Sequence, residues 1–414
     1  MTDEQRYRFI AKINLAFTPG SAIKSTDLFA GRRREIEKAI GTVIQPGQHA
    51  MIYGERGVGK TSLANTLFDF MVLMGNFEYQ RARLNCAEGM SFEEIWRTIF
   101  KQLTTKLEDE DVALDHSFPS NPHSENIREV FELMDDPSIV IIDELDRITD
   151  KSVETQLADT VKTLSDNAVR TTLIMVGVAD SIDQLIAEHR SIERAIRQIH
   201  MERMSKTELL EIVDRGLRQC EGLAIDPVVR ERLADYSRGL PYYTHLLARE
   251  AALAVVRSGR TYMIMPDLDN AIKESVDGHL ESLREAYRIA VRSPKGFNFK
   301  PVLLACALAM KDEHGWFYAT NVREPVRVIT QKNYDIPQFA KHLKAFSDQA
   351  RGPILEKRGR QYRFVEPIME PYVILRGLAD GLIDESQLSR PQATSNEPAQ
   401  LSLLSSSSGP EIEL

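Results

Sequence analysis

Eight consecutive residues have the types and the spacing needed to hold a chain of phosphates. The P-loop pattern is matched by Gly54-Glu55-Arg56-Gly57-Val58-Gly59-Lys60-Thr61, and its glycines let several backbone N–H groups face one phosphate. Lys60 can reach the β- and γ-phosphates, and the Thr61 hydroxyl can ligate Mg²⁺. A helix that begins near Lys60 and includes Ser62 adds the partial positive charge of its N-terminus. We therefore predict that residues 54–62 bind ATP with Mg²⁺.

Two carboxylates follow a buried strand further along the chain. The run 139–142 is apolar throughout, as a buried parallel strand is, and it ends in Asp143 and Glu144. On a strand neighbouring that of the P-loop, Asp143 would lie beside Thr61 and hold Mg²⁺ directly or through water. Glu144 would orient and deprotonate the attacking water. Asp143 alone would suit binding, so the pair indicates hydrolysis of ATP.

The elements that must position these residues alternate between strand and helix. We predict strands at 50–53, 79–85, 138–142 and 171–176, helices at 3–15, 61–74 and 91–107, and a surface loop at 108–126. This alternation predicts the fold class α/β, a P-loop NTPase parallel sheet with helices on both faces. From about 205 to 290 the pattern is helical throughout, with helix starts near Pro227, Pro241 and Pro266.

The composition is that of a cytoplasmic globular protein. No run of about 18 apolar residues is present, and the polar N-terminus lacks the apolar core of a signal peptide, so we expect no membrane partner. Cys86, Cys220 and Cys306 are far apart and lack metal-ligand spacing, which predicts buried reduced thiols.

Charge is distributed unevenly along the chain, which suggests different partners for its parts. Residues 292–363 hold 14 basic and 6 acidic side chains, whereas the remainder of the chain is acidic and the net charge is −9. We predict an N-terminal segment (1–24), a nucleotide-binding α/β domain (25–204), a helical region (205–290), a basic module (291–380) and a disordered tail (381–414) rich in Ser, Pro and Gln.

These residues resemble the AAA+ superfamily over about 25–290. Within it they are similar to archaeal origin-recognition initiators, transposition-helper ATPases and STAND-like signalling NTPases. Phe29-Ala30-Gly31-Arg32 resembles the segment that lies along the adenine in these proteins, which implies nucleotide contacts for Phe29, Gly31 and Arg32. The strand at 172–176 resembles the sensor-1 strand. The polar residue after it would be Asp180 or Ser181, where many members have Asn.

The resemblance also implies an arginine finger, and therefore a homo-oligomer. Arg194 is the first candidate and Arg197 the second, around a predicted helix that also holds Arg190. A solvated charged face is the alternative interpretation of these arginines. Residues 205–256 resemble the helical lid, with Tyr242 in the place of the usual sensor-2 arginine. Arg238 or His245 would be its substitute.

The basic module resembles a winged helix. The order helix, helix, helix and hairpin over 300–366 places Lys341 and Lys344 on a recognition helix at 336–347, and Lys357, Arg358 and Arg360 on the wing at 353–364. These side chains suit contacts with the phosphates of duplex DNA. Winged helices also bind proteins, and the module's charge could simply complement the acidic ATPase domain.

Two functions remain open from the sequence. The first is an AAA+ ATPase that hydrolyses Mg-ATP to switch its assembly state while the winged helix holds DNA. The alternative is a signalling or scaffold NTPase, in defence or regulation, whose winged helix binds an unidentified partner protein. A P-loop protein that binds ATP without hydrolysing it is a third reading.

Overall fold

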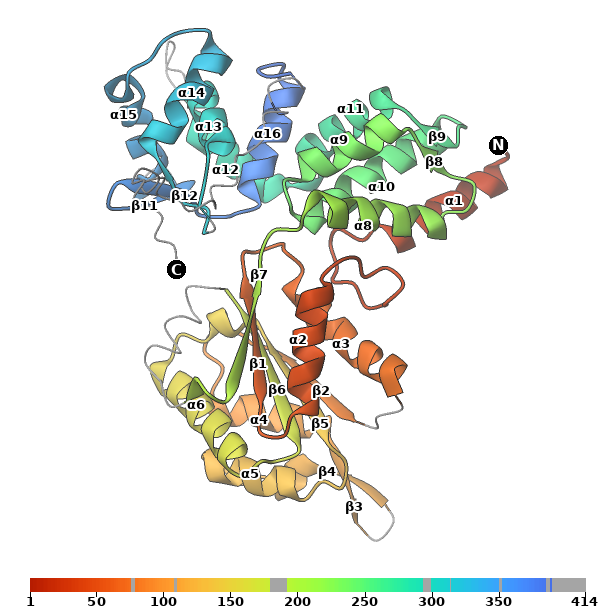
Figure 1. Ribbon diagram of the computed structural model, residues 1–414, viewed down its shortest axis with the longest axis vertical. Helices are drawn as coiled ribbons and strands as arrows, with labels where there is room; N and C mark the ends of the chain where they lie inside the picture. The colour runs from red at the N-terminus through yellow and green to blue at the C-terminus, as the bar shows by residue number, and fades with distance from the viewer. Residues whose placement is uncertain are drawn as a thin grey trace, which may run out of the picture.

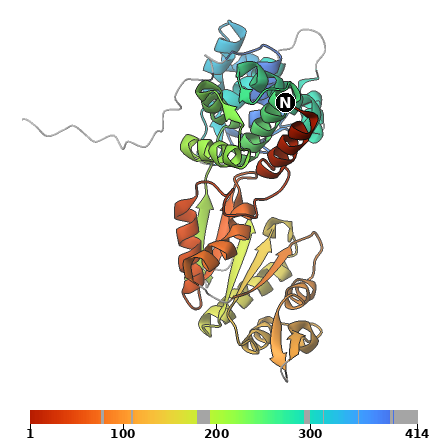
Figure 2. The same ribbon diagram turned by 90° about the vertical axis from the view of Figure 1, so that its right-hand side faces the viewer.

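The computed structural model describes residues 1–75, 79–107, 110–178, 192–292, 299–312, 314–349, 352–384 and 388. An α/β domain occupies the lower half of Figure 1, and the upper half holds a helical bundle beside a C-terminal module, which we define as residues 281–379. The N-terminal helix α1 (Asp3–Ala16) lies against the bundle rather than the sheet, as Figures 1 and 2 show.

Five parallel strands form the central sheet in the order β2-β5-β6-β1-β7. Their bounds are Gln80–Asn85 (β2), Ser138–Asp143 (β5), Thr171–Gly177 (β6), His49–Gly54 (β1) and Ile196–Met201 (β7), which confirms the four predicted strands. The expectation that the strand of Asp143 neighbours the P-loop strand is wrong. Strand β6 follows β5 in the chain and lies between β5 and β1, pairing with both. The strands of Asp143 and of the P-loop are therefore separated by one strand.

Helices cover both faces of the sheet because side chains alternate along each strand. Ala50 and Ile52 of β1 are buried on the face of α2 (Arg33–Ile44) and α3 (Lys60–Gly75). Met51 is buried on the opposite face, with α4 (Phe92–Phe100), α5 (Ser124–Glu132) and α6 (Lys151–Asp166). The predicted α/β fold class, a parallel sheet with helices on both faces, is confirmed.

The chain between α4 and α5 departs from the expectation. Strands β3 (Thr104–Leu107) and β4 (Glu110–Ala113) pair as an antiparallel hairpin, followed by a 3₁₀ turn at Leu114–Ser117. The predicted helix at 91–107 is therefore too long, and the predicted loop at 108–126 contains regular structure. The helical apolar spacing ends at Phe100, and the β-branched residues Thr104 and Thr105 favour a strand.

The helical bundle above the sheet consists of α8 (Lys206–Gln219), α9 (Pro227–Ser237), α10 (Pro241–Arg257) and α11 (Met265–Glu274), with a short pair β8 (Ala224–Ile225) and β9 (Tyr262–Met263). Pro227, Pro241 and Pro266 lie in the first turns of α9, α10 and α11, as predicted. Proline is tolerated there because the first helical N–H groups have no partner within the helix.

The C-terminal module has its own small sheet. Its elements are α12 (Glu281–Val291), α13 (Phe299–Leu308), β10 (Phe317–Tyr318), α14 (Ala319–Thr330), α15 (Ile336–Phe346), β11 (Leu355–Arg358), β12 (Gln361–Phe364) and α16 (Met369–Ala379). Strands β10, β12 and β11 form an antiparallel sheet in that order. The helix predicted at 336–347 and the hairpin at 353–364 are confirmed, while the winged-helix identification and the segment boundaries stay predictions.

Cys86, Cys220 and Cys306 are buried free thiols, as predicted. They lie after β2, at the end of α8 and in α13. Among the described residues, no helix combines the length and apolar character needed to cross a lipid bilayer. The predicted tail lies outside the described residues from residue 389 onward.

Candidate nucleotide-binding site

The P-loop connects the end of β1 to the start of α3. Gly54 passes so close to β7 that a Cβ atom there would lie 2.2 Å from the Met201 carbonyl oxygen. Gly59 has a φ of 98°, a conformation that side chains disfavour, and open space surrounds it. The glycines therefore let the loop lie against the sheet edge while its N–H groups remain available for an anion.

Lys60 lies at the first position of α3, and its ammonium group is bound to the loop itself. Its Nζ donates to the carbonyl oxygens of Gly54 at 3.0 Å and Glu55 at 2.8 Å. Burial lowers the pKa of Lys60 to about 8, although Asp146 and Asp143 favour its charged form. A partly buried cation interacts more strongly with a phosphate than a fully solvated one does.

Asp143 and Glu144 end β5 and differ in environment. The Asp143 carboxylate is buried; its Oδ1 accepts from the Glu144 N–H at 2.8 Å, and its Oδ2 accepts from Arg83 Nη2 at 2.8 Å. Glu144 has a left-handed backbone with φ 57°, uncommon for a residue with a side chain. Its carboxylate is half exposed and accepts from Arg147 at 3.2 Å. One carboxylate is thus fixed, and the other is accessible.

A cavity of about 580 Å³ brings these segments together. It is lined by the P-loop and the start of α3, by Asp143, Glu144 and Asp146, by Gly177 and Val178, by residues 18–23, and by Pro241, Tyr242 and His245. This volume lies within the range of about 300–1,000 Å³ that is usual for small-molecule sites. Thr61 and Asp143, the predicted metal ligands, both line it.

Residues 18–23 form a wall that sequence reasoning missed. The Thr18 N–H donates to His245 Nδ1 at 3.3 Å, and the Ile23 N–H donates to Ser62 Oγ at 3.1 Å. In the sequence this stretch reads only as a break after α1. Its partners are too distant along the chain for a local pattern to reveal them.

Helix α10 of the helical bundle contributes Tyr242 and His245 to the cavity. Burial lowers the pKa of His245 to about 4, so its ring is neutral near pH 7 and Nδ1 can accept the Thr18 hydrogen bond. Arg238 is not among the residues that line the cavity; its carbonyl oxygen accepts from Arg203. Of the two proposed sensor-2 substitutes, His245 is the one that faces the cavity.

The segment predicted to lie along the adenine borders a smaller cavity of about 40 Å³ next to the first. Phe29 and Arg32 line it, together with Val58, Gly59, Ser62 and His245. The Arg32 guanidinium is buried and donates to the carbonyl oxygens of Val58 at 2.9 Å and Glu202 at 2.6 Å. Gly31 is not in this lining; its N–H donates to Glu211 at 3.1 Å. Arg32 therefore stabilises the P-loop through its hydrogen bond to the Val58 carbonyl oxygen.

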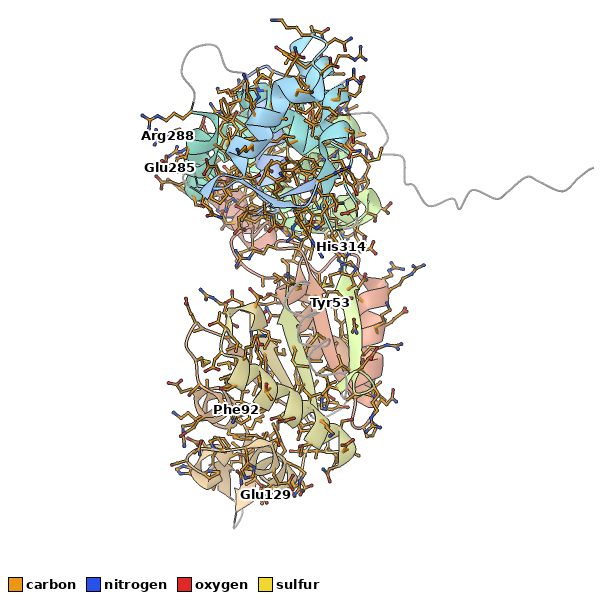
Figure 3. The ribbon with its side chains drawn as sticks, turned by 90° about the vertical axis from the view of Figure 1, so that its left-hand side faces the viewer. Tyr53, Phe92, Glu129, Glu285, Arg288 and His314 are labelled. Carbon is orange, nitrogen blue, oxygen red and sulfur yellow. The ribbon has the colours of Figure 1, made fainter. Side chains whose placement is uncertain are left out.

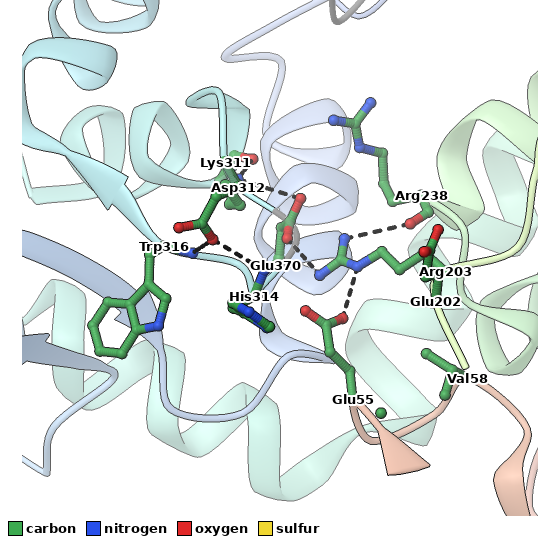
Figure 4. A network of polar contacts seen from close by, with 12 residues as sticks. Glu55, Val58, Glu202, Arg203, Arg238, Lys311, Asp312, His314, Trp316 and Glu370 are labelled. Atoms are coloured by element: carbon green, nitrogen blue, oxygen red, sulfur yellow. Dashed lines mark hydrogen bonds and ion pairs between the residues drawn. The ribbon is translucent and has the colours of Figure 1, made fainter. Parts of the chain in front are cut away.

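The side chains of Glu55 and Arg56 turn toward the C-terminal module. Glu55 accepts from Arg203 Nε at 2.8 Å, as Figure 4 shows, and Arg56 is paired with Glu366 at 3.1 Å. Arg56 also borders the large cavity, whereas Glu55 does not. Their predicted nucleotide contacts would therefore come from the Glu55 and Arg56 backbone or, for Arg56, from a side chain that leaves Glu366.

The predicted catalytic arginines lie apart from this cavity. Arg194 lies in a turn, its side chain is 77% exposed, and it is paired with Asp166 at 2.9 Å. Arg197 lies on β7, so the expected helix around it is wrong; it is exposed and lines a surface cavity to which Arg34 of α2 also contributes. Asp180, Ser181 and Arg190 fall outside the described residues.

The five predicted DNA contacts lie on the surface of the C-terminal module. Lys341 and Lys344 are exposed on α15, and Lys357, Arg358 and Arg360 are exposed on the β11–β12 hairpin. Lys357 Nζ lies 5.8 Å from the centre of the Tyr362 ring. α15 packs against β11, so these side chains lie on neighbouring elements.

The donor set fits Mg²⁺ bound with a nucleotide. One hydroxyl and one carboxylate, Thr61 and Asp143, line the cavity from two sides. In the part of the chain that the structure describes, no group of three His, Cys, Asp or Glu side chains could hold a metal alone. Mg²⁺ retains several waters and is commonly bound by one or two protein oxygens plus phosphates.

Comparisons with known proteins agree with this geometry. Residues 44–186 match the family model of the AAA domain. A search of curated proteins finds no match to this chain. Similar solved structures include a Walker-type ATPase of Pyrococcus abyssi (TM-score 0.51, 16% identity, covering 86% of this chain and 99% of that one). The ORC2 protein of Aeropyrum pernix in ADPNP–ADP complexes is similar with a TM-score of 0.53 and 15% identity, covering 90% of this chain and 97% of that one. The ORC1 protein of Aeropyrum pernix in complex with DNA is similar with a TM-score of 0.50 and 12% identity, covering 89% of this chain and 97% of that one. At such identities the likeness is one of fold, and it extends over nearly the whole length of each relative.

Proposed function

We propose that this chain, whose residues 44–186 match the AAA domain, is an ATPase that hydrolyses Mg-ATP to change its assembly state. The observation that carries this proposal is the cavity in which the P-loop, the carboxylates of Asp143 and Glu144, and the lid residues Tyr242 and His245 meet. Each of these groups suits one part of a nucleotide and its metal.

The chemistry assigned to each residue follows from its surroundings. The loop N–H groups and Lys60 would hold the β- and γ-phosphates, and Thr61 and Asp143 would hold Mg²⁺. When bound, Mg²⁺ would neutralise charge on the phosphates. The accessible Glu144 carboxylate would orient a water molecule and accept its proton.

The finger would come from a neighbouring copy of the chain. Arg194 and Arg197 are exposed at the start of β7, on the outer edge of the sheet, where a second subunit can approach. An arginine supplied in this way stabilises the charge of the transition state and raises turnover by several powers of ten. Hydrolysis would then depend on assembly.

Contacts between the P-loop and the C-terminal module support the switch. Glu55 is paired with Arg203, which is also paired with Glu370 of the module. Arg56 is paired with Glu366, and Ile368 lies next to Gly57. Figure 3 shows Tyr53 of β1 and His314 of the module at the junction of the two lobes. A loop that rearranges around phosphates would therefore act directly on the position of the module.

The basic surface of the module would hold duplex DNA. Lys344, Lys357, Arg358 and Arg360 are exposed on α15 and on the hairpin, and such side chains neutralise phosphates without reading sequence. A fold relative, the ORC1 protein of Aeropyrum pernix, was solved in complex with DNA. DNA binding is thus the partner function we favour.

The alternative is a signalling or scaffold NTPase whose module binds a protein. The observation in its favour is that the module packs on the P-loop through Glu366 and Ile368. Separation of the module from the P-loop would expose the surface that this contact covers. Binding to duplex DNA at rising salt separates the two. A steep, linear fall of log affinity with log salt supports DNA as the partner, and a flat response favours the protein partner.

The main test is the rate of ATP hydrolysis with and without duplex DNA, with particle size followed by light scattering. Glu144→Gln keeps the shape of the side chain and removes its ability to accept a proton, so we expect normal ATP affinity and turnover lowered by about 100-fold or more. Glu154→Gln, a change in α6 that removes an acidic charge away from the cavity, is the matched control. Unchanged turnover in Glu144→Gln would remove Glu144 from the mechanism.

A further inference from the structure

The carboxylate of Asp143 is paired with an arginine that belongs to none of the predicted motifs. Arg83 Nη2 donates to Asp143 Oδ2 at 2.8 Å, and Arg83 Nε donates to Asn85 Oδ1 at 3.2 Å. The Arg83 side chain is 31% exposed, whereas that of Asp143 is 3% exposed. The buried carboxylate therefore has a fixed cation beside it.

Arg83 reaches Asp143 from the neighbouring strand and not from the cavity. In the register of β2 with β5, Asn85 is paired with Asp143 and Arg83 with Ile141. Asp143 lines the cavity, but Arg83 and Asn85 do not. The guanidinium thus acts on one oxygen of the carboxylate from outside the cavity. It is a positioning residue rather than a catalytic one.

The backbone of Arg83 is held at the open edge of the sheet. Its N–H donates to Gln102 Oε1 at 3.0 Å, and its carbonyl oxygen accepts from Gln102 Nε2 at 3.0 Å. This pair of hydrogen bonds substitutes for the strand that the edge lacks. Arg83 can therefore leave Asp143 only by rotation of its side chain.

A guanidinium and a divalent cation compete for a single buried carboxylate. A positive charge within hydrogen-bond distance lowers the attraction of that carboxylate for any second cation, and low solvent exposure strengthens the effect. Without its cation, a buried carboxylate would be left uncompensated. Arg83 supplies that cation in this structure.

We propose that Arg83 holds the Asp143 site closed to free Mg²⁺ and admits the metal only together with a triphosphate. The negative charge of the phosphates supplies the additional attraction that the pair with Arg83 removes. The inference rests on the proposed Mg-ATP site and adds to it a residue that sets the metal dependence of nucleotide binding.

The experiment measures nucleotide binding rather than turnover. The full chain binds a fluorescent, non-hydrolysable ATP analogue, first in EDTA and then at rising free Mg²⁺, and the midpoint of the Mg²⁺ effect is read by anisotropy. In Arg83→Gln we expect this midpoint to fall about tenfold, because the competing charge is lost. Affinity in EDTA should not rise, because Arg83 lies outside the cavity and its loss leaves the negative charge of Asp143 without its partner.

Two controls separate competition from general effects of charge. Arg83→Lys keeps the positive charge, so its midpoint should stay within about threefold of the unmodified value. Arg81→Gln removes a charge two residues away on the same strand. Arg81 lies 4.9 Å from the centre of the Phe68 ring, so its midpoint should not move. A shift in Arg81→Gln as large as that in Arg83→Gln would overturn the proposal.

A second variant keeps the test decisive if Arg83→Gln does not fold. Asn85→Ala removes only the acceptor of Arg83 Nε, and we expect a smaller fall of the midpoint, about threefold. An unchanged or raised midpoint in Arg83→Gln, or in Asn85→Ala if Arg83→Gln does not fold, would overturn the proposal. Absence of nucleotide binding in the unmodified chain, both in EDTA and in Mg²⁺, would instead reject the proposed function.

Discussion

At the scale of single residues, Lys60 is the charge that would change partners if a phosphate bound in the proposed site. Its ammonium is bound to two carbonyl oxygens of its own loop, and these bonds keep a partly buried cation hydrogen-bonded. A phosphate oxygen would offer a charged acceptor in their place, and charged acceptors make stronger hydrogen bonds than carbonyl groups.

We expect Lys60→Ala to weaken ATP binding by about 10- to 100-fold, the usual effect of losing a hydrogen bond between charged groups. Isothermal titration with a non-hydrolysable analogue measures it. Lys38→Ala removes an exposed charge from α2 and should leave affinity unchanged. Intact affinity in Lys60→Ala would reject the assignment of the phosphate cradle.

The residues that sequence could predict belong to local motifs. Residues 54–62, Asp143 and Glu144 could be predicted because each belongs to a short, contiguous sequence pattern. The pairs Arg83–Asp143 and Thr18–His245 were not, since their members are 60 and 227 positions apart. Strand order and the packing of the helical bundle decide which distant residues meet. No single stretch of the sequence contains that information.

At the scale of elements, strands with continuous apolar runs were predictable and the edge strand β7 was not. Strands β5 and β6 are buried at every position. In β7, Ile196 and Ile199 are buried three positions apart while Arg197 and Gln198 between them are exposed. That spacing is typical of a helix, so the sequence favoured one. Pairing with β1 decides the outcome instead.

Strand β1 also carries a buried histidine that makes stability depend on pH. His49 Nδ1 accepts from the Leu173 N–H at 3.1 Å, and burial lowers the pKa of His49 from 6.5 to about 4. Between these values the unfolded chain binds a proton that the folded chain does not. The free energy of unfolding should therefore fall as the pH drops from about 6.5 toward 4.

We expect His49→Asn, which keeps an acceptor but cannot be protonated, to remove about 1 to 2 kcal/mol of the stability lost between roughly pH 7 and pH 5. Urea unfolding followed by tryptophan fluorescence measures it. A Trp316→Phe background leaves the fully buried Trp96 of α4 as the reporter of the α/β domain. An identical loss of stability in both chains would contradict the assignment.

At the scale of the whole molecule, Arg203 joins three parts of the chain. It follows β7 and donates to Glu55 of the P-loop at 2.8 Å, to Glu370 of α16 at 2.9 Å and to the Arg238 carbonyl oxygen at the end of α9 at 3.4 Å, as Figure 4 shows. Burial opposes the charge of Glu370, but Arg203 and Lys311 outweigh it and lower the pKa of Glu370 to about 2.

Arg203→Ala should therefore release the C-terminal module from the α/β domain. Glu370 would keep its pair with Lys311 and the weaker influence of the Arg238 charge, and breaking a buried pair from one side costs about 3 to 5 kcal/mol. Small-angle X-ray scattering should record a larger radius of gyration. Arg56→Ala breaks a pair that is exposed on both sides and should cost less than about 1 kcal/mol. A compact Arg203→Ala chain would contradict this account of the junction.

The distribution of cysteines has a practical consequence for following such motions. Cys86, Cys220 and Cys306 lie one in each of the three parts, and burial raises the pKa of Cys86 to about 12, of Cys220 to about 11 and that of Cys306 further still. Only the thiolate reacts with an alkylating reagent, so each thiol stays unlabelled until the structure around it opens and exposes it to solvent. Timed alkylation with peptide mass spectrometry would thus rank the opening of sheet, lid and C-terminal module in an unmodified chain. Nucleotide that tightens the first two should slow labelling at Cys86 and Cys220.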